Sequence, residues 1–401
     1  MILSFTRIFN LLKIIVSYFI SRITGRVIHW GNPVAVSIEP ANFCNLSCPE
    51  CPAGMKKLTR HEGLMQPETF QSIISQMLPH LSYLTLYFQG EPYLNRHFLN
   101  FIAFARSKKI FVATATNGHF LDEATVRQTI TSGLNQLIIS LDGADQESYQ
   151  AYRMGGDFAK VVAGIRLLVI EKKRMKSDKP EIILQCLLLK SNEHKLAEIK
   201  KLGKDLGVNK ITFKTAQFND YSQGNPLMPE NPKLTRYIRI SGKSEETQNP
   251  KFKIQKSKVK NQKSKVKSQN PKVKIQNSKF KIQTCKSNLK TEKVFHFPIF
   301  KFADSQIKTP PVNQNTKSAA TYSIKNRQPN SCFRMWSSCV ITWDGNVVPC
   351  CFDKDAKYVA GNMNKQNFNE IWRGHFLQEF RKNISQDRKS IDICTNCSQS
   401  F

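Results

Sequence analysis

Short apolar runs alternate with amphipathic stretches from residue 34 to residue 222. The runs are rich in β-branched and aromatic residues and have the length of buried strands. Between them, apolar residues recur at helical spacing, as in PETFQSIISQML (67–78) and FAKVVAGIRLLVIEKK (158–173). The predicted strands are VAVSIE (34–39), YLTLYF (83–88), IFVATAT (110–116), QLIISL (136–141), EIILQCLLL (181–189) and KITFK (210–214).

This alternation predicts the fold class. Six βα units in chain order indicate a parallel sheet with right-handed crossovers. Six strands are too few to close an eight-stranded barrel, so we predict an α/β fold with an open, partial (β/α)6 TIM-like barrel at residues 34–222. Active sites of such folds gather at the carboxyl ends of the strands, and the loops that follow the strands are therefore the places to look for chemistry.

Residues 1–33 form a basic, apolar segment for which the sequence predicts an amphipathic helix. Its longest uncharged stretch, Ile14 to Ser21, is far shorter than the roughly 20 residues that span a bilayer. Two interpretations stay open: a helix that lies on the inner membrane surface, and a helix that packs on the catalytic domain. Its predicted apolar stripe consists of Phe5, Ile8, Leu12, Ile15, Phe19 and Ile23, and its basic residues are Arg7, Lys13, Arg22 and Arg26.

Nearly half of the net charge of +30 comes from one short segment. Residues 249–283 consist of five seven-residue units, beginning NPKFKIQ and KSKVKNQ, and 14 lysines but no acidic residue lie between Thr247 and Thr291. The apolar positions of the units lack coiled-coil spacing, and two prolines oppose a helix. We therefore interpret residues 223–330 as a linker that contains a disordered lysine-rich insertion. An RNA- or anion-binding tract is the alternative, and nucleic acid is the less favoured partner.

Eleven cysteines are clustered rather than spread along the chain. The N-terminus has no secretory signature, so we interpret the cysteines as reduced metal ligands of a cytoplasmic protein rather than as a disulfide framework. Cys44, Cys48 and Cys51 follow the first predicted strand with the spacing C-x3-C-x2-C, and the next cysteine is Cys186. A structural zinc site needs four protein ligands. Three thiolates suit a 4Fe–4S cluster that leaves one iron open to another ligand.

The C-x3-C-x2-C spacing after a first βα-type strand resembles the signature of the radical S-adenosylmethionine (SAM) enzymes. The resemblance implies that the amino and carboxylate groups of SAM chelate the open iron. It further implies that SAM is cleaved to methionine and a 5′-deoxyadenosyl radical, which abstracts hydrogen from a substrate. An electron donor such as flavodoxin or ferredoxin would then be a partner.

Residues at the ends of the second and third strands agree with this resemblance. The stretch Gln89-Gly90-Glu91-Pro92 resembles the family's Gly-Gly-Glu motif, in which backbone groups and the carboxylate hold the methionine ammonium. The resemblance gives this role to Gly90 and Glu91, although Gln89 departs from the motif. Asn117, which follows the third strand, lies in a Thr-Asn-Gly sequence that is also common in the family.

The fourth strand ends in Ser140-Leu141-Asp142-Gly143. The resemblance implies that Ser140 and Asp142 bond the ribose or the carboxylate of SAM, and that Arg153 pairs with that carboxylate. From the residues alone, Ser140 as a strand-end cap and Arg153 as a charge on a helix surface remain open.

Residues 331–401 hold six of the eleven cysteines and resemble the SPASM or twitch extension of radical SAM enzymes. The stretch VITWDGNVV predicts a hairpin that turns at Asp344-Gly345-Asn346. The resemblance implies an auxiliary 4Fe–4S cluster, to which it assigns Cys332, Cys350, Cys394 and Cys397. Cys351 is an alternative to Cys350, Cys339 suits a small core position, and a four-cysteine zinc site is the alternative metal centre.

The sequence as a whole therefore predicts a radical SAM enzyme that uses two iron–sulfur clusters. Whole-chain similarity extends to bacterial radical SAM/SPASM proteins in which an apolar, basic N-terminus precedes the core. Two substrate classes are open: a peptide or protein to be modified, and a small molecule such as an envelope sugar or lipid-linked compound. A non-enzymatic metal- or RNA-binding protein is the alternative function.

Overall fold

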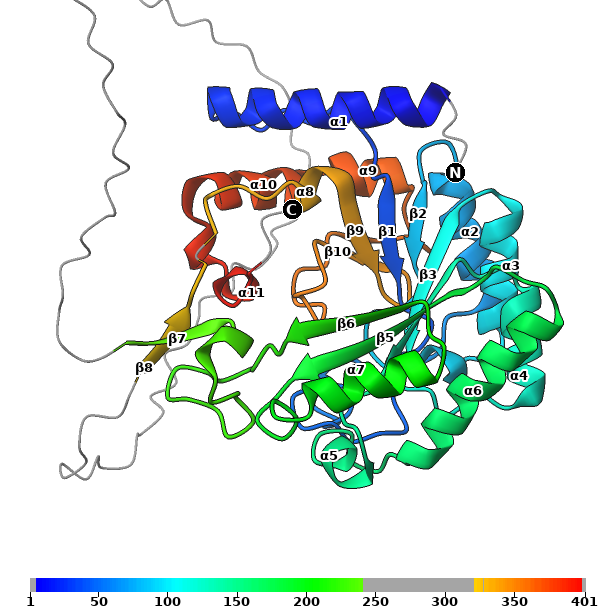
Figure 1. The fold of residues 1–401 in the computed structure, drawn as a ribbon. Helices are drawn as coiled ribbons and strands as arrows, with labels where there is room; N and C mark the ends of the chain where they lie inside the picture. Colours follow the sequence, from blue (N-terminus) through cyan, green and yellow to red (C-terminus); the bar gives the residue numbers. More distant parts are fainter. Residues whose placement is uncertain (1–4, 241–320, 327, 399–401) are drawn as a thin grey trace, which may run out of the picture. The chain divides into compact units, whose positions relative to one another are not determined.

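A computed structural model describes residues 5–240, 321–326 and 328–398, which belong to one compact unit (Figure 1). Six parallel strands lie side by side in chain order, as the alternating pattern predicted. The predicted lysine-rich insertion at 249–283 lies outside the described residues. The strands are β1 (Ala35–Ile38), β2 (Tyr83–Thr85), β3 (Phe111–Thr116), β4 (Gln136–Ser140), β5 (Glu181–Leu188) and β6 (Lys210–Thr215).

Helices connect these strands, and the longer ones, such as α2, α3 and α6, each bury an apolar face. Both helices that the sequence predicted in detail are present: α2 begins at Pro67, a favourable first helical position, and α6 begins after Asp157, whose side chain accepts from the Lys160 N–H. The connecting helices are α2 (Pro67–Met77), η1 (Pro92–Leu94), α3 (Phe98–Ser107), α4 (Glu123–Thr131), α5 (Gln146–Gln150), α6 (Phe158–Arg174) and α7 (Leu196–Asp205).

The cysteine-rich C-terminal segment extends the same sheet. The predicted hairpin forms from β9 (Ser338–Ile341) and β10 (Asn346–Val348), and β9 pairs in parallel with β1. The order β11-β10-β9-β1-β2-β3-β4-β5-β6 results, with β11 (Gly361–Asn362) at one edge. Pairing with β9 covers the free edge of β1, which would otherwise expose unpaired backbone groups. The remaining C-terminal helices are α8 (Arg334–Ser337), α9 (Phe368–Arg373), α10 (His375–Asp387), η3 (Arg388–Ser390) and α11 (Asp392–Thr395).

The region predicted as a linker contributes a second, small sheet. Strand β7 (Tyr237–Ile240) pairs in antiparallel fashion with β8 (Thr321–Ile324), and η2 (Pro232–Leu234) precedes them. Tyr237 is buried and its hydroxyl accepts a hydrogen bond from the Phe218 N–H at 3.0 Å. The two strands thereby attach to the loop that follows β6.

Helix α1 (Phe5–Thr24) packs on the side of the molecule formed by α8, α9 and α10 (Figure 1). Its inward face is largely polar. Asn10 exchanges two 2.8 Å hydrogen bonds with the main chain of Asn32, and the Ser21 hydroxyl bonds both the N–H and the carbonyl of Ile28. Tyr18 packs edge-on against Trp336 at 5.3 Å between ring centroids. The helix therefore docks through hydrogen bonds and a few buried contacts.

The predicted apolar stripe of α1 faces away from this docking surface. Phe5 and Ile23 are each 83% exposed, and Leu12 and Phe19 are each 52% exposed. Ile8 is also exposed, whereas Ile15 is half-buried. In the part of the chain that the structure describes, no helix has both the length and the hydropathy to cross a bilayer.

His29 links α1 to the C-terminal module and predicts a pH dependence of stability. Its ring packs edge-on against Trp372 at 5.1 Å, and burial, together with the nearby Arg381, lowers its pKa to about 3. The unfolded chain therefore binds a proton below about pH 6.5 that the folded protein excludes, so the free energy of unfolding falls as the pH drops from there.

Thermal unfolding measured between pH 5 and pH 7 should show this effect. The stability of the wild type relative to His29→Phe should fall by about 1.4 kcal/mol for each pH unit below 6.5. The exposed His375→Phe variant serves as the control and should follow the wild type. Parallel pH profiles of the wild type and His29→Phe would contradict the burial of an uncharged imidazole.

Candidate functional site

The first cysteine loop lies at the carboxyl end of β1, where the fold class predicted chemistry. The Cys51 N–H donates to the carbonyl of Cys48 at 3.1 Å, and the Leu46 N–H points to the sulfur of Cys44 at 3.5 Å. Leu46 and Cys48 belong to a buried apolar cluster that includes Tyr152, whereas Cys44 and Cys51 are half-buried.

Burial raises the pKa of the Cys44 thiol and that of Cys48, the latter to about 11. The neighbouring Cys51 raises both further, whereas Arg153 lowers the pKa of Cys48. Three thiolates held together in a low-dielectric loop need a cationic partner, and iron in a bound cluster supplies this charge. The loop therefore fits the iron–sulfur cluster that its spacing implies.

Gly90 holds the cysteine loop against the end of β2. It has a φ of +72°, and a Cβ atom at this position would lie 2.5 Å from the Ala41 oxygen and 2.6 Å from the Phe43 oxygen. The next residue, Glu91, donates its N–H to the same Phe43 oxygen at 2.9 Å. Phe43 immediately precedes Cys44, so only glycine permits this backbone approach.

The Glu91 carboxylate is buried and aims at the end of β3. Its Oε1 accepts from the Thr116 hydroxyl at 2.9 Å and from the Tyr93 N–H at 3.2 Å, and its Oε2 accepts from the Asn117 N–H at 2.8 Å. Burial raises its pKa to about 7, and these hydrogen bonds oppose that shift. An ionised carboxylate has about four acceptor positions, and these three hydrogen bonds use three of them. The Glu91 carboxylate is therefore able to accept one further hydrogen bond.

The side chain of Asn117 joins β3 to the cysteine loop. Its Nδ2 donates to Asn45 at 2.8 Å and lies 3.7 Å from the sulfur of Cys44, while its Oδ1 accepts from the His119 N–H at 3.1 Å. Asn117 thus directs an N–H toward one of the three sulfurs. Asn45 and His119 complete this arrangement, although sequence reasoning did not identify them.

Arg153 is an internal cation rather than a charge on a helix surface. Its Nε donates to the Asp142 carboxylate at 2.6 Å, and its Nη1 lies 3.9 Å from the sulfur of Cys48. Asp142 is fully buried and also accepts from the Leu187 N–H at 2.6 Å. Each carboxylate oxygen of Asp142 accepts one of these bonds, and the bond to Arg153 orients the guanidinium. Ser140, at the end of β4, lies half-buried on the same edge of the sheet.

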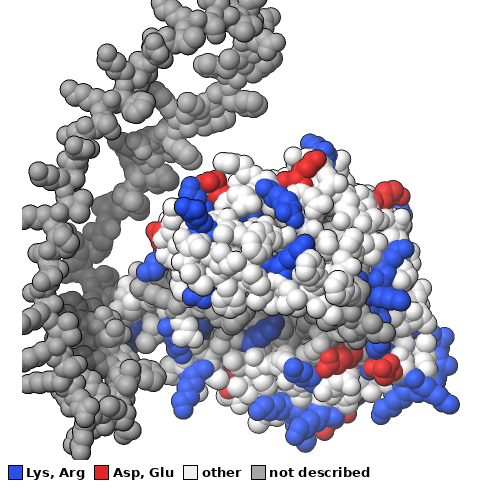
Figure 2. Space-filling model, turned by 90° about the horizontal axis from the view of Figure 1, so that it is seen from above, with Lys and Arg blue, Asp and Glu red and all other residues white. Residues whose placement is uncertain are grey.

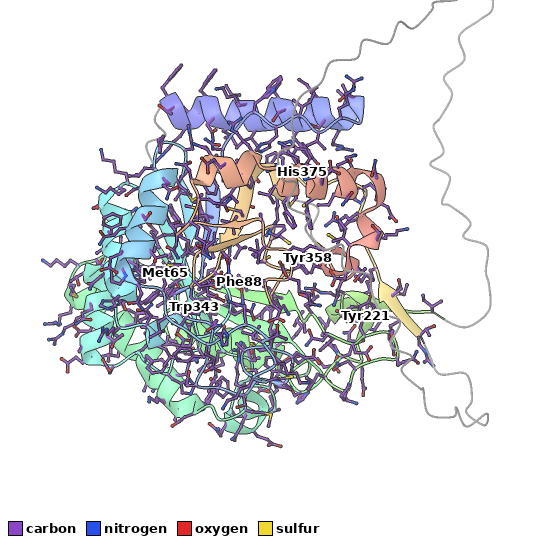
Figure 3. All side chains as sticks on the ribbon, turned by 180° about the vertical axis from the view of Figure 1, so that it is seen from behind. Met65, Phe88, Tyr221, Trp343, Tyr358 and His375 are labelled. Carbon is purple, nitrogen blue, oxygen red and sulfur yellow. The ribbon has the colours of Figure 1, made fainter. Side chains whose placement is uncertain are left out.

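A buried ion pair beside the site was not anticipated from the sequence. Arg60 makes two 2.6 Å hydrogen bonds to Glu39, which directly follows β1 and has no solvent exposure. The Trp343 N–H, in the turn between β9 and β10, donates to the same carboxylate at 3.2 Å. Trp343 and Phe88, whose ring lies beneath the Arg60 guanidinium, are labelled in Figure 3. The sequence feature that could have indicated this ion pair is a charged residue, Glu39, at the end of an apolar strand.

Four of the C-terminal cysteines line one small apolar cavity. They are Cys332, Cys350, Cys394 and Cys397, the residues assigned from the SPASM resemblance. Arg388 also lines this cavity and lies 3.2 Å from the sulfur of Cys397. Burial raises the pKa of Cys350 well above its usual range and that of Cys394 to about 11. Buried thiols in a group beside an arginine suit an anionic metal cluster.

Cys351 and Cys339 do not line this cavity. The Cys351 sulfur lies 3.6 Å from Arg334, whereas Cys339 is a buried core residue of β9, as predicted. Within residues 5–240, 321–326 and 328–398, no three His, Cys, Asp or Glu side chains are arranged to hold a single metal ion. Cysteines around a multi-iron cluster bind different irons and need not meet at one point.

A larger cavity of about 470 Å³ lies inside the open sheet, beside the C-terminal module. Strands β1, β2, β6 and β9 and helix α8 all contribute to its lining. Phe88 lies at its β2 side, two residues before Gly90, and Cys350 and Cys351 lie at its C-terminal side. The cavity therefore adjoins the second cysteine group, and its β2 side leads toward Gly90, which contacts the first cysteine loop.

Comparison with known families matches two parts of the chain. Residues 38–177 match the family model described as "Radical SAM superfamily". Residues 332–398 match the SPASM model, described as "Iron-sulfur cluster-binding domain". The two matched segments contain all seven cysteines of the two candidate sites.

Curated relatives and solved structures agree with this assignment. A 2-deoxy-scyllo-inosamine dehydrogenase of Niallia circulans that depends on S-adenosyl-L-methionine is 36% identical over 69 residues, which are 17% of this chain but only 28% of that enzyme. The tungsten-containing aldehyde ferredoxin oxidoreductase cofactor-modifying protein of Pyrococcus furiosus is 22% identical over 379 residues, 90% of this chain and 86% of that protein.

The crystal structure of Streptococcus suis SuiB bound to S-adenosylmethionine superimposes with a TM-score of 0.54 at 12% identity, covering 92% of this chain and 73% of SuiB. This likeness supports the shared fold, and the predicted α/β class is confirmed.

Proposed function

The chain belongs to the radical SAM superfamily and carries a C-terminal SPASM iron–sulfur domain, and we propose that it cleaves SAM reductively and abstracts a hydrogen atom from a substrate in the 470 Å³ cavity. The observation that carries this proposal is the meeting of Cys44, Cys48 and Cys51 with Glu91 and Arg153 at one edge of the sheet. The 4Fe–4S cluster, when bound, supplies the electron for SAM cleavage.

The protein residues bind and orient SAM around that cluster. Glu91 accepts a hydrogen bond from the methionine amino group through its remaining acceptor position, and Gly90 places the neighbouring backbone close to the loop. Arg153 pairs with the methionine carboxylate, and Asp142 holds the guanidinium in place. Asn117 donates toward Cys44, and Ser140 faces the ribose.

The auxiliary site holds a second 4Fe–4S cluster on Cys332, Cys350, Cys394 and Cys397. The shared lining of one cavity supports this set, and it favours Cys350 over Cys351. An electron donor of the flavodoxin or ferredoxin type supplies reducing equivalents. Apolar residues beside Cys48 limit the access of water to that side of the cysteine loop.

Anaerobic turnover tests this function. Reconstituted full-length protein, incubated with SAM and a strong reductant, should release 5′-deoxyadenosine and methionine in equal amounts, measured by liquid chromatography with mass spectrometry. Iron and sulfide analysis should give about eight of each per chain, as expected for two four-iron clusters. Zinc as the dominant metal, or an intact cluster without SAM cleavage, would favour the non-enzymatic metal- or RNA-binding alternative.

We further propose that α1 attaches the enzyme to an anionic membrane surface. The helix uses its polar face to bind the protein and leaves Phe5, Leu12, Phe19 and Ile23 exposed. No acidic residue precedes Glu39, whereas Lys13, Arg22 and Arg26 are all exposed. Figure 2, which views the molecule from the α1 side, shows more blue Lys and Arg than red Asp and Glu side chains.

This arrangement matches the chemistry of a lipid surface with negative head groups. Exposed apolar side chains enter the boundary of the acyl region, and each nearby basic side chain adds about 1 kcal/mol of attraction to anionic lipids. The contact favours the second substrate class, an envelope sugar or lipid-linked compound, over a peptide or protein.

Vesicle sedimentation should distinguish this membrane contact from non-specific adsorption of the protein. The full-length protein should bind phosphatidylglycerol vesicles, and Leu12→Glu with Phe19→Glu should reduce that affinity by about tenfold or more, because apolar contact is lost and negative charge is added. The matched control is Ile170→Glu with Ile238→Glu, which changes the same charge at other exposed apolar positions. Equal losses in the two double variants, or no vesicle binding by the wild type, would refute the membrane contact.

A further inference from the structure

The cavity inside the sheet has an unbalanced charge. Lys214 on β6 and Arg334 on α8 both line it, whereas no aspartate or glutamate does. The lining residues all belong to the described part of the chain. The other polar groups there are hydroxyls and thiols, including Ser37, Tyr87 and Cys351. The cavity therefore presents cations and neutral donors to whatever occupies it.

Lys214 and Arg334 lie close enough for their charges to interact. Burial lowers the pKa of Lys214, the nearby Cys351 raises it, and the nearby Arg334 lowers it. Two like charges in a partly desolvated space oppose each other, which is a cost that a bound anion removes. The Lys214 Nζ makes no hydrogen bond or ion pair with any acceptor in the described residues.

The two assigned cysteine groups do not depend on Lys214 for a neutralising charge, although Cys350 and Cys351 line the same cavity. Arg153 already lies 3.9 Å from the sulfur of Cys48, and Arg388 lies 3.2 Å from that of Cys397. Each cysteine group thus has its own arginine. Arg334 lies 3.6 Å from the sulfur of Cys351, which is outside the four-cysteine cavity. Lys214 instead approaches from β6, an element that carries none of the candidate cluster ligands.

The geometry points to an oxyanion site: we infer that Lys214 and Arg334 bind a phosphate or carboxylate group of the substrate inside the cavity. This inference rests on the proposed function, because it assumes that the substrate occupies the space between the two cysteine groups. Burial also raises the pKa of Tyr87, so its hydroxyl stays protonated and is able to donate to the same oxyanion.

The position of this site fixes which end of the substrate is charged. Phe88 lines the cavity two residues before Gly90, on the side of the first cysteine loop. Arg334 and Cys351 lie on the side of the C-terminal module. A substrate anchored by its oxyanion between Lys214 and Arg334 therefore presents its uncharged carbon skeleton toward Phe88, where hydrogen abstraction would take place.

Equilibrium dialysis of the reconstituted full-length protein tests the site, with radiolabelled inorganic pyrophosphate and glutarate as separate probes. Lys214→Met should weaken binding about tenfold, as expected for the loss of a charge-assisted hydrogen bond, and Lys214→Arg should restore it. Lys210→Met is the matched control, because Lys210 and Lys214 are exposed lysines of the same strand and only Lys214 lines the cavity.

The outcomes distinguish a phosphate from a carboxylate ligand, and they distinguish failure of the oxyanion site from failure of the proposed SAM cleavage. Tighter binding of pyrophosphate assigns a phosphate group, and tighter binding of glutarate assigns a carboxylate. Binding of neither probe by the wild type, or an equal loss in Lys210→Met and Lys214→Met, overturns the oxyanion site. SAM cleavage by the wild type is measured in the same preparations, so failure of the proposed function is recognised independently of anion binding.

Discussion

Cys44→Ala is expected to abolish formation of 5′-deoxyadenosine while the second cysteine group keeps its iron. Only three thiols form the first group, so loss of one leaves no spare ligand nearby, and the following cysteine in the chain, Cys186, lies buried in the core. The second group draws on residues from 332 onward and shares no ligand with the first. Iron content should therefore fall to about half rather than to zero.

Cys339→Ala is the matched control for this experiment. It removes a buried thiol from β9 that lies outside the four-cysteine cavity, so both clusters should form and SAM cleavage should persist. Iron, sulfide and 5′-deoxyadenosine are measured on each anaerobically reconstituted variant. Retention of full iron and of SAM cleavage in Cys44→Ala would contradict the assignment of this loop.

The sequence predicted the strands and the cysteine loop well because both are local patterns. A buried parallel strand is a short apolar run, and C-x3-C-x2-C places three ligands within eight residues. Pairings between distant segments were harder to predict. The bond between Asp142 and Arg153 depends on how the chain returns after β4, and the contact of Trp343 with Glu39 joins residues that are 304 positions apart.

The attachment of the C-terminal hairpin to β1 also escaped prediction. The sequence indicated a compact second module, but nothing in SCVI (338–341) specifies β1 as its partner. Likewise, the periodicity of α1 identified an apolar stripe without indicating which face meets the protein. The Asn10 and Ser21 hydrogen bonds, which need their partners Asn32 and Ile28 in place, settle that orientation.

Gly90→Ala is expected to lower SAM cleavage by about 100-fold or more, although it adds a single methyl group. The new Cβ would lie 2.5 Å and 2.6 Å from main-chain oxygens of Ala41 and Phe43. Main-chain atoms cannot rotate away as a flexible side chain can, so the loop that leads from β1 into Cys44 must move. A displacement of about 1 Å at a reacting site costs about 100-fold in rate.

Gly25→Ala separates this clash from the general cost of alanine in a left-handed conformation. Gly25 has a φ of +69°, close to the +72° of Gly90, but a Cβ atom there meets nothing within 4 Å. Both variants should lose about 1–2 kcal/mol of stability from backbone strain, whereas only Gly90→Ala should lose SAM cleavage. Thermal unfolding and 5′-deoxyadenosine formation are measured on both proteins. If Gly90→Ala cleaves SAM as fast as Gly25→Ala, the close approach of Gly90 to the cysteine loop does not position the cluster ligands.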